Sequence, residues 1–331
     1  MQTPIQSILR AATRNNTKLK ILTSVTHESY ESNLCLTGHN FYAMPGKDIK
    51  PWREDYRPRP KNYHLLPSQE IPLGLEFDLV LSQNRFGQYQ LLAPFAKKMG
   101  IPICTIEHTL PMEWHKPILS KFKEMRGETN LFISAYSRQE WGWEENEADV
   151  IVHGVNTDLF CYPEKRNKSP YILVVVNDFV NRGEILGYKL FEELVKGLPC
   201  KLIGDTAPIS KPAKDVNELV SLYQNARVFL NTSKVSPIPS VIMEAQSCGV
   251  PVVSTNNCMI PEVVDDKVTG FLSNDKTELR QYLELLLEDE RLATSMGLQG
   301  RERMKERYSL QAFVGEWDKQ LVKTANTVFR G

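Results

Sequence analysis

Short apolar runs alternate with amphipathic stretches along most of this chain. Apolar runs bounded by turn residues are typical of strands, and apolar residues at helical spacing are typical of helices. The pattern favours an α/β protein with two doubly wound parallel sheets. It predicts helices over Gly87–Met99, Glu184–Lys196 and Asn217–Asn225, and strands over Lys20–Val25, Asp78–Ser82, Pro102–Ile106, Leu131–Ser134, Val150–Val152, Tyr171–Val176, Leu202–Gly204, Val228–Asn231 and Val252–Ser254.

The length of 331 residues exceeds what one hydrophobic core usually organises, so we expect two domains. Residues 160–169 are charged, contain proline and have no period, which is typical of a linker. We therefore predict domains over residues 1–160 and 161–310. A final helical region, broken near Tyr308 and Ser309, places Phe313, Trp317, Leu321 and Ala325 on one apolar face.

Composition indicates a globular protein and gives no sign of a polyanionic partner. Hydrophobic residues make up 41% and charged residues 24%, and Lys plus Arg equals Asp plus Glu at 40 each. The six cysteines are scattered without metal-ligand spacing, and no stretch is apolar enough for a signal peptide or a membrane span. We expect reduced thiols, a cytoplasmic location and no transmembrane segment.

Residues 236–249 read as a loop that leads into a helix. Pro237 and Pro239 exclude a helix there, whereas the sequence from Ser240 to Gly249 has helical spacing. Free amides at a helix N-terminus attract a diphosphate, and a carboxylate one turn inside can accept hydrogen bonds from ribose. An ordinary loop and helix of an α/β domain is the alternative. The candidate donor-binding residues of this segment are Ser236, Ile238, Pro239, Ser240, Val241 and Glu244.

The same segment resembles the donor-site signature of retaining, family 4-like glycosyltransferases (glycosyl transferases group 1). The matching residues are Glu244, Ala245, Gly249, Pro251, Val252, Val253, Pro261, Glu262 and Thr269–Leu272. The family usually carries a first glutamate eight residues before Glu244, where this chain has Ser236. Serine can hydrogen-bond a sugar hydroxyl but brings no negative charge.

The resemblance implies a GT-B fold, in which two doubly wound Rossmann-like domains face a cleft and a closing helix, here 311–331, crosses back to the first domain. It implies a hexosyl- or pentosyltransferase that needs no cofactor besides its substrate, a UDP- or GDP-sugar. The sequence has no Asp-x-Asp motif of the metal-binding kind, so we expect metal-independent catalysis.

Two further strand exits carry candidate chemistry. Arg182-Gly183 resembles the basic-Gly pair of the family's phosphate motif, and Asn177 stands where the family has a companion arginine. Arg182 is therefore a candidate for stabilising the leaving diphosphate and Asn177 for binding the donor. His108 follows a predicted strand and resembles the histidine that faces the sugar. The alternatives are an exposed loop arginine and a structural histidine.

The acceptor side matches the family poorly. Thr26 or Ser29 could cap a helix that starts near Glu28, and Thr26, His27 and Glu28 are acceptor-side candidates, although they could equally be surface residues. Residues 39–64 interleave aromatic and basic side chains, among them Trp52 and Arg53. Such a segment could bind a glycan or nucleic acid, or it could be a proline-ordered loop whose aromatic rings pack on the domain.

Three functions remain open from the sequence. The first is transfer of a sugar from a nucleotide-sugar to a hydroxyl of a glycan or glycoconjugate. The second is a phage-type glycosyltransferase that modifies a hydroxymethylated DNA base, which must be flipped out of the helix. The third is a catalytically weak binding protein that keeps the GT-B fold.

Overall fold

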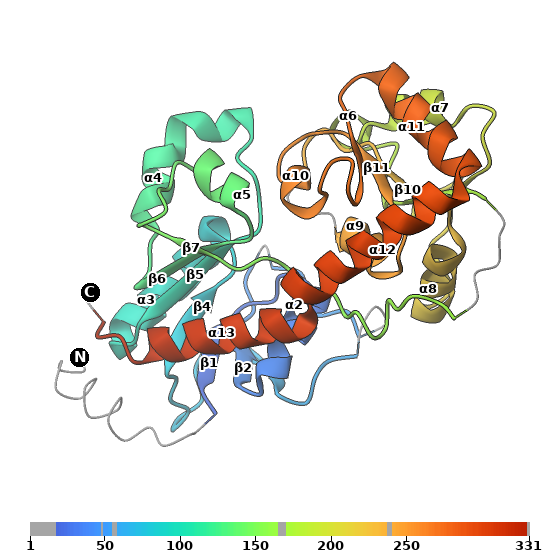
Figure 1. Cartoon of the computed structure of the whole chain (residues 1–331). Helices are drawn as coiled ribbons and strands as arrows, with labels where there is room; N and C mark the ends of the chain where they lie inside the picture. Colours follow the sequence, from blue (N-terminus) through green and yellow to red (C-terminus); the bar gives the residue numbers. More distant parts are fainter. Residues whose placement is uncertain (1–17, 48, 55–57, 165–169, 237–239, 330–331) are drawn as a thin grey trace. The chain divides into compact units, whose positions relative to one another are not determined.

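The chain divides into two compact units (Figure 1). The computed structural model describes residues 18–47, 49–54, 58–164, 170–236 and 240–329. Unit 1 comprises Met1–Val152 and Gln311–Gly331, and unit 2 comprises His153–Leu310. The division falls after residue 152, whereas the sequence places it after residue 160.

Unit 1 is built on a seven-stranded parallel sheet in the order β3-β2-β1-β4-β5-β6-β7. β1 pairs with β2 on one side and with β4 on the other, so the strand order reverses between β1 and β4. The strands are β1 (Lys20–Thr23), β2 (Asn40–Ala43), β3 (Tyr63–Leu65), β4 (Leu79–Ser82), β5 (Ile103–Glu107), β6 (Thr129–Phe132) and β7 (Asp149–Val150).

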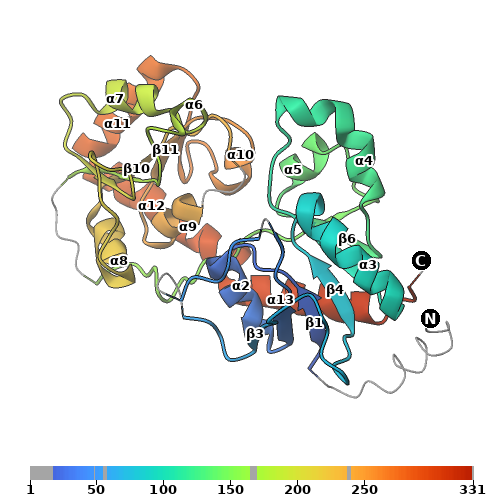
Figure 2. The same cartoon turned by 180° about the vertical axis from the view of Figure 1, so that it is seen from behind.

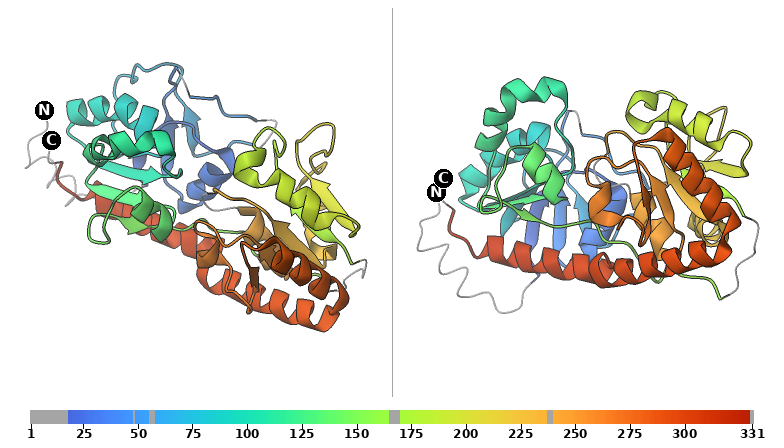
Figure 3. Two further views of the ribbon diagram at one scale, coloured as in Figure 1. Left: turned by 90° about the horizontal axis from the view of Figure 1, so that it is seen from above. Right: turned by 45° about the horizontal axis from the view of Figure 1, so that its top comes forward.

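Helices cover both faces of this sheet. Leu92 and Ala96 of α3 pack with Leu22, Val80 and Ile103 on one face, as Figure 2 shows beside β4. On the other face α13 lies across the strands (Figure 3, red helix and blue strands), and the predicted apolar face of α13 is buried. The helices are α2 (Glu28–Leu34), α3 (Gln90–Met99), α4 (Leu119–Glu124), α5 (Ala135–Glu140) and α13 (Leu310–Ala325).

Unit 2 has a five-stranded parallel sheet in the order β12-β11-β10-β8-β9. β8 pairs with β9 and with β10, so the order reverses between β8 and β10. The strands are β8 (Ile172–Val175), β9 (Cys200–Ile203), β10 (Val228–Asn231), β11 (Val252–Ser254) and β12 (Gly270–Leu272).

The strands of unit 2 are buried on both faces. Val228 and Leu230 of β10 belong to a core with α7 and α11, whereas Phe229 contacts Tyr223 of α8 at 5.9 Å between ring centroids. Figure 1 shows α11 and α8 on opposite sides of these strands. The helices are α6 (Gly183–Leu186), α7 (Tyr188–Val195), α8 (Val216–Asn225), α9 (Ser240–Ser247), α10 (Ile260–Val263), α11 (Lys276–Glu288) and α12 (Glu290–Arg307).

The nine predicted strands all occur, with ends shifted by at most a few residues, but the pattern missed β2, β3 and β12. The segment over residues 39–64 is therefore not one loop, because it begins in β2 and ends in β3. The predicted helix over Glu184–Lys196 is two helices, since Gly187 between them has φ +76°. None of the helices in the described part of the chain combines the length and hydropathy that crossing a bilayer requires.

Candidate functional site

The loop that carries Arg182 leaves the sheet of unit 2 at the point where the strand order reverses. Open α/β sheets bind ligands at the carboxyl ends of the strands beside such a point. Asp178, with φ +54°, turns the chain, and its carbonyl accepts a hydrogen bond from the Arg182 amide at 3.1 Å. Arg182 is exposed and precedes α6. Its guanidinium group is therefore open to solvent at the carboxyl edge of β8.

A second loop, which follows β10, is fixed against the first. The carbonyl oxygen of Ile185 accepts hydrogen bonds from the amides of Lys234 at 2.8 Å and Val235 at 3.2 Å. The Thr232 hydroxyl donates to the Leu186 carbonyl at 2.9 Å. A Cβ atom at Gly187 would lie 2.1 Å from the Thr232 carbonyl oxygen, so only glycine permits this approach. The loops that carry Arg182 and Ser236 are thus joined within unit 2.

α9 follows the second loop and presents Glu244 about one turn inside the helix. The helix begins at Ser240, and Gly249, with φ +71°, follows its end, as the sequence predicts. Glu244 is half-buried, and its Oε2 accepts a hydrogen bond from the hydroxyl of Tyr223 at 2.8 Å. Burial, and then the neighbouring Glu244, raise the pKa of Tyr223 well above its usual value, so the phenol stays protonated and donates.

Backbone packing against α12 holds α9 in place. A Cβ atom at Gly297 would lie 2.1 Å from the Gly249 carbonyl oxygen, and one at Gly300 would lie 3.0 Å from Gln246 Oε1. The Arg301 guanidinium donates to the carbonyl of Ser247 at 2.5 Å. Two glycines therefore let a long helix support the short helix that carries Glu244.

The remaining donor-side candidates differ in what the structure describes. Ile238 and Pro239 lie outside the described residues. Ser236 and Val241 are half-buried and Ser240 is exposed, and Ser240 is the first helical residue and not the residue before the helix. Asn177 is exposed, but its Oδ1 accepts a hydrogen bond from the Asp205 amide at 2.8 Å. Asn177 therefore joins the exits of β8 and β9.

Unit 1 places Thr26, His27 and Glu28 at its own reversal point, at the carboxyl end of β1. The helix starts at Glu28 as predicted, but its cap is His27, whose Nδ1 accepts from the Tyr30 amide at 3.5 Å. The prediction that Thr26 or Ser29 caps the helix is therefore wrong. The Thr26 hydroxyl instead donates to the Ser24 carbonyl and accepts from the side chain of Gln88 at 2.6 Å.

Glu31 fixes this loop from inside the domain. Its side chain is fully buried, and Oε2 accepts from the amides of Thr26 at 3.0 Å and His27 at 3.1 Å. Oε1 accepts from the Tyr63 hydroxyl at 2.5 Å and from Gln83 Nε2 at 2.8 Å. Burial raises the pKa of Glu31 to about 7, against the opposite effect of these four donors. The loop after β1 thus depends on a carboxyl group that titrates near neutral pH.

His108 is half-buried at the carboxyl end of β5, where the sequence places it. Its ring meets the ring of Tyr30 edge-on, with centroids 4.6 Å apart. The Tyr30 hydroxyl accepts a hydrogen bond from Trp317 Nε1 of α13 at 2.9 Å. The C-terminal helix therefore supports the residue against which His108 packs.

A buried arginine and a buried glutamate organise the segment before His108. The Arg85 guanidinium lies 4.8, 4.7 and 4.8 Å from the ring centroids of Phe122, Phe132 and Trp143. Its backbone amide donates to Glu107 Oε2 at 3.1 Å. Burial lowers the pKa of Arg85 to about 10 and raises that of Glu107. These residues link the exits of β4 and β5.

The two remaining acceptor-side candidates have different environments. The Arg53 amide donates to Glu28 Oε1 at 3.2 Å, which ties its loop to the start of α2. Trp52 is 6% exposed and packs on Tyr63, with ring centroids 4.7 Å apart. The interpretation of a segment whose aromatic rings pack on the domain therefore holds for Trp52, whose ring is not presented to a ligand.

Sequence reasoning missed the residues that act through others, namely Glu31, Gln88, Glu107 and Tyr223. Glu31 had a usable signal, because a glutamate one turn into a helix commonly reaches back to the amides before it. Tyr223 had none, since its partner Glu244 lies on another helix and the contact depends on the packing of α8 against α9.

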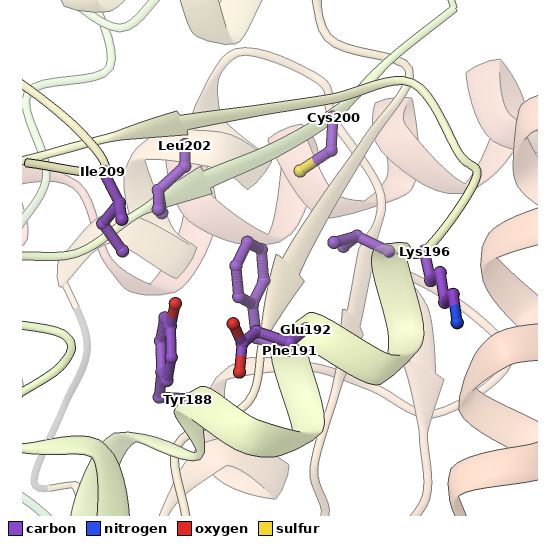
Figure 4. Close-up of a pocket in the computed structure, with 8 residues that line it drawn as sticks. Tyr188, Phe191, Glu192, Lys196, Cys200, Leu202 and Ile209 are labelled. Carbon is purple, nitrogen blue, oxygen red and sulfur yellow. The ribbon is translucent and has the colours of Figure 1, made fainter.

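A hollow of about 420 Å³ lies elsewhere in unit 2, between α7 and the edge strand β9. Figure 4 shows Tyr188, Phe191 and Glu192 of α7 facing Leu202 and Ile209 across it. None of the candidate site residues lines it. Within the ranges that the structure describes, no three His, Cys, Asp or Glu side chains are grouped so as to hold a metal ion.

Comparison with known proteins identifies the region that contains much of this site. Residues 211–303 match the family model "Glycosyl transferases group 1". The chain carries a group 1 glycosyltransferase domain. It is 32% identical over 100 residues to the capsular polysaccharide biosynthesis glycosyltransferase CapM of Staphylococcus aureus, covering 30% of this chain and 26% of the relative. It is 28% identical over 134 residues to the human alpha-1,3/1,6-mannosyltransferase ALG2, covering 40% and 32%.

A third relative of this group 1 domain is the N-acetyl-alpha-D-glucosaminyl L-malate synthase of Bacillus anthracis. It is 35% identical over 104 residues, covering 31% of this chain and 27% of the relative. The matched region thus spans between 26% and 32% of the length of these three relatives.

Solved structures extend the likeness to nearly the whole chain and show a GT-B fold. HepE of Anabaena in complex with UDP has a TM-score of 0.73 at 15% identity, over 93% of this chain and 100% of that one. Sucrose-phosphate synthase of Thermosynechococcus elongatus has a TM-score of 0.68 at 15% identity, over 92% and 100%. HepE has also been solved in complex with UDP-glucose.

Proposed function

We propose that this protein is a retaining glycosyltransferase that moves a sugar from a UDP- or GDP-sugar to a hydroxyl of a glycan or glycoconjugate. The observation that carries the proposal is the junction in unit 2 of the Arg182 loop, the loop after β10 and the start of α9. A cation, free helix amides and a carboxylate there are what a nucleoside diphosphate requires. The group 1 domain and the likeness to HepE, solved with UDP, support it.

In the proposed reaction the bond between the anomeric carbon and the diphosphate oxygen breaks. A new bond forms from the acceptor oxygen to the same face of the sugar. The acceptor proton passes to a phosphate oxygen of the leaving nucleotide. Arg182 and the amides at the start of α9 neutralise the developing negative charge, Glu244 binds the ribose hydroxyls, and His108 positions the sugar. Thr26, His27, Glu28 and Arg53 are proposed for the acceptor side.

The DNA-modifying alternative is not carried forward. Its motivation was the run of aromatic and basic residues over 39–64. Phe41, Trp52 and Tyr63 of that run are 0%, 6% and 2% exposed, so these three rings serve the core of unit 1 and do not form a stacking surface.

A panel of UDP- and GDP-sugars tests the proposal. Release of sugar with the anomeric configuration of the donor, analysed before mutarotation, is the expected result. Binding of nucleotide without turnover of any donor would instead favour a GT-B binding protein. Failure to bind either nucleotide would contradict both readings.

Arg182→Ala is the specific test of leaving-group stabilisation. Turnover should fall about a hundredfold or more, since a lost preorganised charge contact typically costs that much. Lys196→Ala is the matched control, because it removes the same charge from an exposed position just before β9, at the opposite edge of the sheet. Equal rates for the two variants would refute the role of Arg182.

A further inference from the structure

Tyr223 stands out among the buried polar residues of unit 2 because its hydroxyl meets a candidate ligand-binding group. The side chain is 0% exposed, and its ring contacts Phe160 and Phe229, each at 5.9 Å between centroids. Phenylalanine would fill this space as well. The hydroxyl is needed for its hydrogen bond of 2.8 Å to Glu244 Oε2.

The two helices that carry this pair are held independently of it. α8 is capped by Asp215, which accepts from the Glu218 amide at 2.9 Å, and the Tyr171 hydroxyl donates to the Leu222 carbonyl at 2.7 Å. α9 is fixed through its contact with α12. With both backbones fixed, the freedom that remains at this point is the side-chain rotation of Glu244.

We propose that Tyr223 is a positioning residue, which holds the Glu244 carboxylate in the orientation that binds the ribose hydroxyls of a nucleoside diphosphate. The inference rests on the proposed function. A carboxylate has about four acceptor sites, so one bond from a phenol fixes its orientation and leaves capacity for a diol. Because the raised pKa of Tyr223 keeps the phenol protonated, the bond persists across the neutral range.

Tyr223→Phe tests the proposal, with Tyr171→Phe as the matched control. Both substitutions remove a buried hydroxyl that bonds to α8 or from it, but only Tyr223 reaches Glu244. The dissociation constants of UDP and GDP are measured by calorimetry. Tyr223→Phe should weaken binding of the nucleotide that wild type binds about threefold to tenfold, the usual cost of immobilising one flexible side chain. The donor KM should rise with kcat within about twofold. Tyr171→Phe should leave both unchanged.

A double-mutant cycle separates positioning from general damage. In a Glu244→Ala background, Tyr223→Phe should change nucleotide affinity less than about twofold, because the group it orients is gone. Equal losses in the two Phe variants, or a loss that persists without Glu244, would overturn the inference. A wild-type protein that binds neither nucleotide would overturn the proposed function itself, and this inference with it.

Discussion

Glu31→Gln should abolish a pH dependence of stability that the buried carboxyl group imposes on unit 1. Burial raises the pKa of Glu31 from 4.5 to about 7. Below pH 4.5 the group is protonated in both the folded and the unfolded chain. As the pH rises, the unfolded chain ionises first, so the folded state loses stability until the folded carboxyl group also ionises near pH 7.

The size of the effect follows from the two pKa values. At about 1.4 kcal/mol per pH unit of difference, the rise from 4.5 to about 7 corresponds to a loss of about 3 kcal/mol in the free energy of unfolding. The glutamine variant has no proton to exchange. It should also carry an offset at all pH values, because its amide group faces donors where the carboxylate accepted from four.

Urea unfolding from pH 4 to pH 8 measures the difference between wild type and Glu31→Gln. All five tryptophans of the chain lie in unit 1, so tryptophan fluorescence reports on this unit alone. The stability of wild type relative to the variant should fall by about 3 kcal/mol across this range. A difference that stays flat, or that grows with pH, would show that the four donors outweigh burial and that the reasoning is wrong.

Two glycine substitutions give further predictions. Gly187→Ala should destabilise unit 2 by about 2 kcal/mol or more, from its positive φ and from the contact with Thr232, and should weaken nucleotide binding. Gly197→Ala, also at φ +76° but with open space around it, isolates the contact, and equal losses in urea unfolding followed by circular dichroism would refute it. Gly315→Ala, in the exposed middle of α13 with nothing near its Cβ, should instead stabilise unit 1 by about 0.5–1 kcal/mol, measured by tryptophan fluorescence; a loss would contradict this.

The sequence predicted the strands that are continuous apolar runs, because strands buried on both faces leave that signal. It missed β2, where burial alternates, and β3 and β12, which have three residues each. The reversal points and the exits that carry Arg182, Glu244 and His108 were accessible from spacing and resemblance. The contacts that orient them were not. The bonds from Tyr223 to Glu244 and from Glu31 to the loop after β1 join separate elements, and only packing decides such pairs.

The approach of α12 to α9 through Gly297 and Gly300 has a consequence for how this protein can vary. A methyl group at either position would press against the helix that carries Glu244, although neither glycine touches Glu244 itself. Engineering that diversifies only the loops around Arg182 and Ser236 leaves this constraint unchanged. A library that includes the buried face of α12 would shift the height and tilt of the ribose-binding helix, and with them the range of nucleotides accepted.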